Sequence, residues 1–96
     1  MTEPHRWLVL ARHEGHEGIV SFDIGPPRFH GSRARALRQA VIDALRYFRD
    51  DEFELTDPVE LPLTHTNDEV DDAMHALVDN DVTFHESSTA LRRSIA

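Results

Sequence analysis

Cysteine and lysine are both missing from this chain of 96 residues. Without cysteine there can be no disulfide bond, no thiol nucleophile and no thiolate metal site. Without lysine, all ten cationic side chains other than histidine are arginines. A GC-rich genome or adaptation to high salt would each produce that bias, so the lysine-free composition alone does not identify a partner.

Long apolar runs are missing as well. The stretch near the start, Trp7–Ala11, has five residues, whereas a membrane-spanning helix needs about 18 or more. The sequence shows no glycine-rich phosphate loop and no Gly-x-Ser-x-Gly nucleophile motif. We therefore expect a soluble, cytoplasmic protein that needs no cofactor, does not contact membranes, and binds other molecules rather than catalysing a reaction.

Charge is sorted into two blocks along the chain. The segment Arg28–Arg49 has six arginines and one acid, and Asp50–Ala90 has thirteen acids and neither arginine nor lysine. The formal net charge of the whole chain is −8. Two poles of opposite charge in so short a chain predict either an interaction surface or a fold that neutralises itself.

The apolar pattern predicts secondary structure along most of the chain. Two strands, Trp7–Ala11 and Ile19–Ile24, are joined by a turn containing two glycines, and Gly25-Pro26-Pro27 ends the second. A helix capped by Ser32 should run to about Arg49. The remaining elements are an extended segment, 53–63, broken at Asp57-Pro58, a helix from the Thr66–Glu69 capping box to near Asn80, and a strand, Val82–His85.

This order, β-β-α-β-α-β with a hairpin start, predicts an α+β fold. We expect a two-layer sandwich with a sheet of about four strands and the helices on one face. Residues 1–86 should form one domain, and 87–96 a C-terminal tail that is a short helical turn or disordered. The predicted core comprises Trp7 or Leu8, Val20, Phe22, Leu37, Val41, Leu45, Phe48, Leu61, Met74, Leu77 and Phe84.

Four arginines are the best candidates for binding. In the predicted helix, the residues opposite the apolar stripe include Arg35, Arg38, Arg46 and Arg49, and their guanidinium groups suit carboxylates or phosphates. Three roles remain open for these arginines: binding an acidic protein partner, binding a nucleic acid, and neutralising the acid block of the same chain. Homo-oligomerisation through the opposite charges is a further option.

Seven histidines raise the question of a metal site. His13 and His16 lie three residues apart in the first turn, and His85 or His30 would be needed as a third ligand. The glycines of the turn exclude a helical His-Glu-x-x-His motif, so a solvated turn with exposed, metal-free histidines is expected instead. Ser21, Asp23, His85 and Glu86 lie on predicted strands, but no oxyanion hole is implied, and no catalytic residue is assigned.

The first part of the chain resembles the antitoxin family whose partners are toxins with a double-stranded-RNA-binding-like fold. The resemblance is carried by the hairpin, by Gly31-Ser32 and by an alanine-rich helix in which Ala36, Gln39 and Ala40 stand in corresponding places. Arg35 occupies the place of the family's glutamate, and Gly25-Pro26-Pro27 differs from the family's element. The resemblance implies a small regulatory binding module. We therefore predict an acidic, non-catalytic protein-binding module, with a nucleic-acid-binding module or a histidine-based metalloprotein as alternatives.

Overall fold

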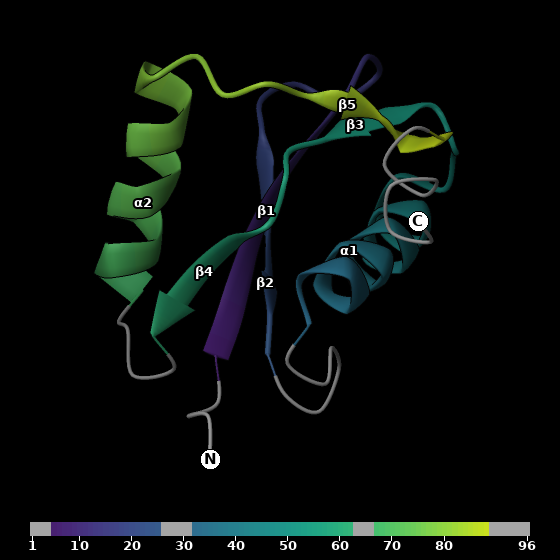
Figure 1. The fold of residues 1–96 in the computed structure, drawn as a ribbon. Coiled ribbons are helices and arrows are strands. Elements are labelled where there is room, and N and C mark those ends of the chain that lie inside the picture. Colours follow the sequence, from purple (N-terminus) through teal and green to yellow (C-terminus); the bar gives the residue numbers. More distant parts are fainter. Residues whose placement is uncertain (1–4, 26–31, 63–66, 89–96) are drawn as a thin grey trace.

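The computed structural model describes residues 5–25, 32–62 and 67–88, and Figure 1 shows their arrangement. The fold is α+β, as the sequence predicted. The elements in chain order are β1 (His5–His13), β2 (Val20–Ile24), α1 (Arg33–Phe48), β3 (Phe53–Leu55), β4 (Val59–Pro62), α2 (Asn67–Asp79) and β5 (His85–Glu86). The strands form one five-stranded sheet in which every pairing is antiparallel.

Strand β1 is the centre of the sheet. It pairs with β2 along one edge and with both β3 and β4 along the other. Its residues Trp7–Ala11 are each at most 8% exposed, which confirms the prediction of a buried strand. Alternate side chains of a strand point to opposite faces. Trp7, Val9 and Ala11 join the core under α1, so the intervening Leu8 and Leu10 point to the other face.

The predicted break at Asp57-Pro58 separates β3 from β4. Ala11 pairs with Leu55 and Leu8 pairs with Val59, so three residues of the outer segment stand opposite two of β1. This is the geometry of a β-bulge. Thr56 bridges the irregular step, because its N–H donates to the Leu10 carbonyl (2.9 Å) and its Oγ1 accepts from the Leu10 N–H (3.0 Å). The sheet has five strands rather than about four for this reason.

Helix α1 has the predicted bounds and the predicted N-cap. The Ser32 hydroxyl accepts from the Arg35 N–H at 3.0 Å, as an N-cap should. Arg49 ends the helix in the left-handed region (φ 57°), and its N–H donates to the Leu45 carbonyl. Its buried residues include Leu37 and Val41 of the predicted core, and the full set is Ala36, Leu37, Ala40, Val41 and Ala44. They pack against the face of the sheet that carries Val9, Ile24 and Leu55.

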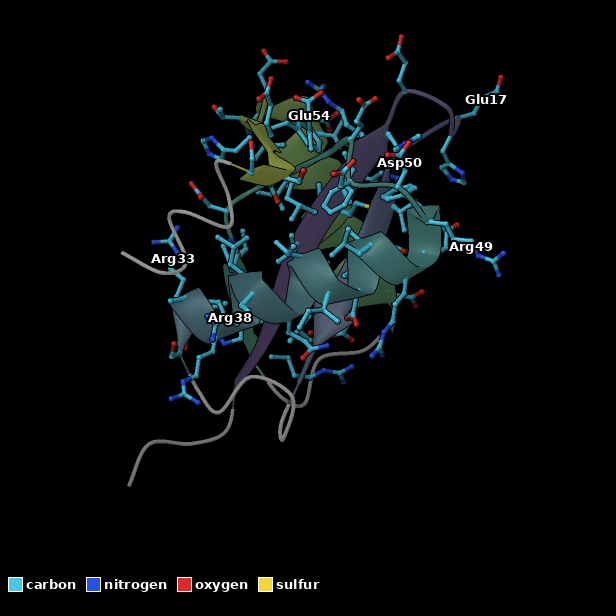
Figure 2. The ribbon with its side chains drawn as sticks, turned by 90° about the vertical axis from the view of Figure 1, so that its right-hand side faces the viewer. Glu17, Arg33, Arg38, Arg49, Asp50 and Glu54 are labelled. Atoms are coloured by element: carbon cyan, nitrogen blue, oxygen red, sulfur yellow. The ribbon has the colours of Figure 1, made fainter. Side chains whose placement is uncertain are left out.

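Helix α2 packs less closely than α1. Met74 and Leu77 of the predicted core are only half-buried, as are Val70 and Ala73. Figures 1 and 2 agree that α1 and α2 lie on opposite sides of β1. The two helices therefore do not share one face as expected: α1 lies over the face that carries Val9, and α2 lies on the side to which Leu8 and Leu10 point.

Two expectations about the core need correction. Leu45 is 41% exposed, because it lines an open groove between α1 and the strands β3 and β5. The predicted strand 82–85 is reduced to β5, His85–Glu86, which pairs with Glu54 and Leu55 only. Phe84 instead lies below the Arg12 guanidinium, 4.2 Å from its Cζ to the ring centroid. The predicted capping residue Thr66 and the tail beyond residue 88 lie outside the described residues.

In the described ranges, no helix is long and apolar enough to cross a membrane.

Candidate functional site

The outer side of α1 carries a band of arginines, which we call the arginine strip: Arg35, Arg38, Arg46 and Arg49. All four side chains are exposed, as predicted. At 3.6 residues per turn they fall within a sector of about 80° and along about 21 Å of helix. Figure 2 looks onto α1 and shows Arg38 and Arg49 extending from it. Ile42, in the middle of the same sector, is 37% exposed.

The strip has no partner among the described residues of the chain itself. The two arginine ion pairs within those residues use other side chains. Arg6 pairs with Asp23, and Arg12 forms two hydrogen bonds to Glu54, at 3.2 and 3.0 Å. Neutralisation of the acid block by the strip is therefore not seen in the part of the chain that the structure describes.

A groove adjoins the arginine strip. It has a volume of about 720 Å³ and lies between α1 and the strands β3 and β5, and we call it the acidic groove. Val41, Leu45 and Phe53 supply its apolar lining. Its other lining residues are Arg12, Glu14, Asp51, Glu52, Glu54, Glu86, Ser87 and Ser88. Five of these are acids, so the surface beside the strip has the opposite charge. Sequence reasoning missed this groove.

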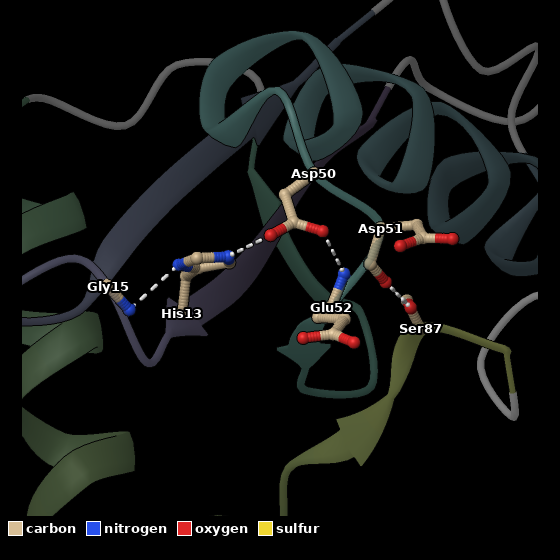
Figure 3. A network of polar contacts seen from close by, with 6 residues as sticks. All are labelled: His13, Gly15, Asp50, Asp51, Glu52 and Ser87. Carbon is tan, nitrogen blue, oxygen red and sulfur yellow. Dashed lines mark hydrogen bonds and ion pairs between the residues drawn. The ribbon is translucent and has the colours of Figure 1, made fainter.

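The histidine turn is held against the end of α1, and Figure 3 shows the contacts that fix it. His13 Nε2 lies 3.1 Å from Asp50 Oδ2, and His13 Nδ1 accepts from the Gly15 N–H at 2.9 Å. The ring also stacks on Phe48, with centroids 5.1 Å apart. Because Nδ1 is an acceptor, Nε2 must carry the hydrogen that is donated to Asp50. The prediction that His13 is solvent-exposed is therefore wrong: its side chain is 16% exposed.

This histidine–aspartate pair is not arranged for catalysis. A general base needs one ring nitrogen free to receive a proton from a nucleophile. In His13 both nitrogens are already engaged, one with Asp50 and the other with the Gly15 amide. Its visible role is to fasten the first hairpin to the residues that follow α1.

The other histidines and polar candidates lie at separate places in the fold. His16 is exposed and meets the edges of Tyr47 and Phe48. His85 pairs with Asp57 (3.5 Å), and Asp23 pairs with Arg6. Ser21 and Asp23 lie on β2 and Glu86 on β5, at opposite ends of the strand order. Among the described residues no three metal-ligating side chains gather, and His30 lies outside them.

The comparisons with known proteins give no family or relative. No protein-family model, no curated protein and no solved structure matches the chain. The function therefore has to be argued from the residues described above.

Asp50 gives the site a pH-dependent element. The Glu52 backbone N–H donates to its Oδ1 (3.1 Å), and this bond and the one from His13 lower the pKa of Asp50 below its usual 3.8. A lowered carboxyl pKa stabilises the fold above the unfolded-state value, and this contribution is lost as pH falls through the folded-state pKa. We expect Asp50→Asn to be less stable than the wild type at pH 5, with the difference shrinking toward pH 2.

Urea denaturation at pH 5, 4, 3 and 2 measures that difference. Asp51→Asn is the matched control. Asp51 is the exposed neighbour of Asp50, and within residues 5–25, 32–62 and 67–88 its carboxylate accepts no hydrogen bond, since Ser87 donates to its backbone carbonyl instead. Its difference from the wild type should not vary with pH in the same way. A constant difference for Asp50→Asn would show that the Asp50 carboxylate does not stabilise the fold.

Proposed function

We propose that this protein is a small, non-catalytic protein-binding module of the inhibitor or antitoxin kind, and that its arginine strip binds an acidic surface of a protein partner in the cytoplasm. The observation that carries the proposal is the exposure of four arginines on one sector of α1, with no ion pair to any of them among the described residues. Guanidinium groups bind carboxylates in a planar, bidentate geometry. Such a strip suits a surface that presents several carboxylates in a row.

The surroundings of the strip favour a protein over a nucleic acid. The groove beside it is lined by five acids, and the chain as a whole carries a net charge of −8. A nucleic acid has a continuous negative backbone, so it would be repelled wherever it ran past the strip. A folded protein has charges of both signs and can place its acids on the arginines while keeping them away from the groove.

The arginine strip can be tested with a polyanion of each class. The probes are fluorescently labelled poly-L-glutamate of roughly 20 residues and a labelled DNA duplex of similar charge, titrated in 0.05 M NaCl and followed by fluorescence anisotropy. We expect the variant with all four strip arginines changed to glutamine to bind polyglutamate about tenfold more weakly or worse. Four exposed ion pairs, each worth about 0.2–1 kcal/mol, account for a loss of this size.

Arg33→Gln is the matched control, because Arg33 is exposed on α1 but lies outside the sector of the strip. Its affinity for polyglutamate should remain within about twofold of the wild type. Equal binding by the wild type and the four-arginine variant would disprove the proposal. Tighter, arginine-dependent binding of the duplex would favour nucleic acid as the partner instead.

A further inference from the structure

The arginine strip and the acidic groove are neighbours on one face of the molecule. Both border α1: the strip occupies its outer sector, while Val41 and Leu45 line the groove. In Figure 2 Arg38 and Arg49 of the strip extend from the helix, and Glu54 lies above it. Leu45 is 41% exposed and Ile42 is 37% exposed, so the helix also presents apolar side chains to solvent here. This face therefore combines the arginine strip, which we also call the basic band, a few apolar side chains, and the acids of the acidic groove, which we also call the acidic band.

The acidic groove contains a pair of like charges that destabilises the sheet. Glu54 on β3 and Glu86 on β5 are direct partners in an antiparallel pair. Like charges in such positions destabilise a sheet. Arg12 offsets the charge of Glu54, while Glu52 and Asp51 add further negative charge to the same groove. A cationic surface placed over the groove would relieve this repulsion.

We propose that the occupant of this face is a second copy of the same chain, docked so that the arginine strip of each copy covers the acidic groove of the other. The inference deepens the proposed function and rests on it, because the arginine strip is again the binding element. Within residues 5–25, 32–62 and 67–88, the arginine strip is a cationic surface of the right extent, and it lies beside the groove itself. A face that carries both bands is complementary to its own rotated image.

In this dimer the two-fold axis runs along the border between the arginine strip and the acidic groove, roughly parallel to α1. Rotation about that axis exchanges the bands, so that basic meets acidic on both sides, and it brings the exposed Leu45 side chains toward the centre. A standard interface takes about 800 Å² from each partner, and the chain has a total accessible surface of 6368 Å². About one eighth of the surface would therefore be used. In the dimer the arginine strips are covered, so an outside acidic partner would have to compete with self-association.

Sedimentation velocity of the wild-type chain between about 1 and 200 µM in 0.05 M NaCl tests whether it dimerises. We expect a monomer–dimer equilibrium in the micromolar range, and a dissociation constant at least tenfold higher in 1 M NaCl. The Debye length falls from about 10 Å at 0.1 M salt to about 3 Å at 1 M, which screens attraction between the bands.

Two charge-reversal variants test which surfaces meet. One is Arg38→Glu with Arg46→Glu, and the other is Glu52→Arg with Glu86→Arg. All four side chains are exposed. Each variant alone would place like charges against each other at both contacts, so each should be monomeric. An equimolar mixture should form a one-to-one heterodimer, because every contact is then between opposite charges. Arg33→Glu, outside the strip, should dimerise like the wild type.

Three results would overturn the inference. They are a wild type that stays monomeric at 200 µM in 0.05 M NaCl, a mixture of the two variants that stays monomeric, and assemblies that grow beyond dimers. If the wild type is monomeric but a chain ending at Ser88 dimerises, the occupant of the groove is the chain's own segment 89–96 and not a second copy. If self-association fails while polyglutamate still binds through the arginine strip, the proposed function stands and only the second copy is lost.

Discussion

Replacing Leu10 by alanine is expected to lower the free energy of unfolding by about 3–5 kcal/mol, because the side chain is completely buried in the central strand. The loss combines the transfer of apolar atoms with the cavity that remains between rigid neighbours. A domain of this size has a total stability of about 5–15 kcal/mol, so the variant should be close to unfolding. Urea denaturation should show a much lower midpoint with an unchanged slope.

Leu45→Ala is the matched control, since the same atoms are removed from a side chain that is 41% exposed beside the acidic groove. It should cost about 1 kcal/mol, because the site is already open to water and no closed cavity forms. Equal losses at both positions would mean that Leu45 is covered in solution. The same variant should weaken self-association, because Leu45 lies near the proposed two-fold axis.

The contrast between these leucines shows how far the sequence determines the core. The stripe in α1 predicted correctly which side of the helix faces the sheet, and the apolar run Trp7–Ala11 predicted a buried strand. Helical periodicity does not say how wide the sheet is. Leu45 sits at the margin of the apolar stripe, and whether it is buried depends on β3 and β5. Strand β3 has three residues because it ends at the bulge, where Thr56 takes over the pairing with Leu10, and β5 has two residues.

The same limit applies to the candidate site. The exposure of the arginine strip follows from the phase of one helix, so a local pattern was enough to predict it. The acidic groove combines Glu14 from the first hairpin, Glu52 and Glu54 from the region after α1, and Glu86 from β5. These residues are brought together by pairings between segments that are distant in the chain. The partial burial of His13 has the same origin, because its partner Asp50 lies 37 residues later.

The bulge at Thr56 leads to the second large effect. The Thr56 side chain is fully buried, and its Oγ1 is the acceptor for the Leu10 N–H. Valine has nearly the same shape as threonine but no acceptor. Thr56→Val would therefore leave a buried N–H without a partner, and should cost about 1–3 kcal/mol. Thr56→Ser keeps the oxygen and removes one methyl group, and should cost about 1 kcal/mol.

Stability alone would not separate these two causes if the losses happened to be similar. Hydrogen exchange at the Leu10 amide separates them, because the hydrogen bond to Thr56 Oγ1 protects that one proton. In Thr56→Val the Leu10 amide should exchange faster than expected from the global loss of stability, whereas in Thr56→Ser it should follow the global loss. If the Leu10 amide stays equally protected in Thr56→Val, another group accepts its hydrogen bond. The Thr56 side chain would then not be what joins β3 and β4 into one continuous edge along β1.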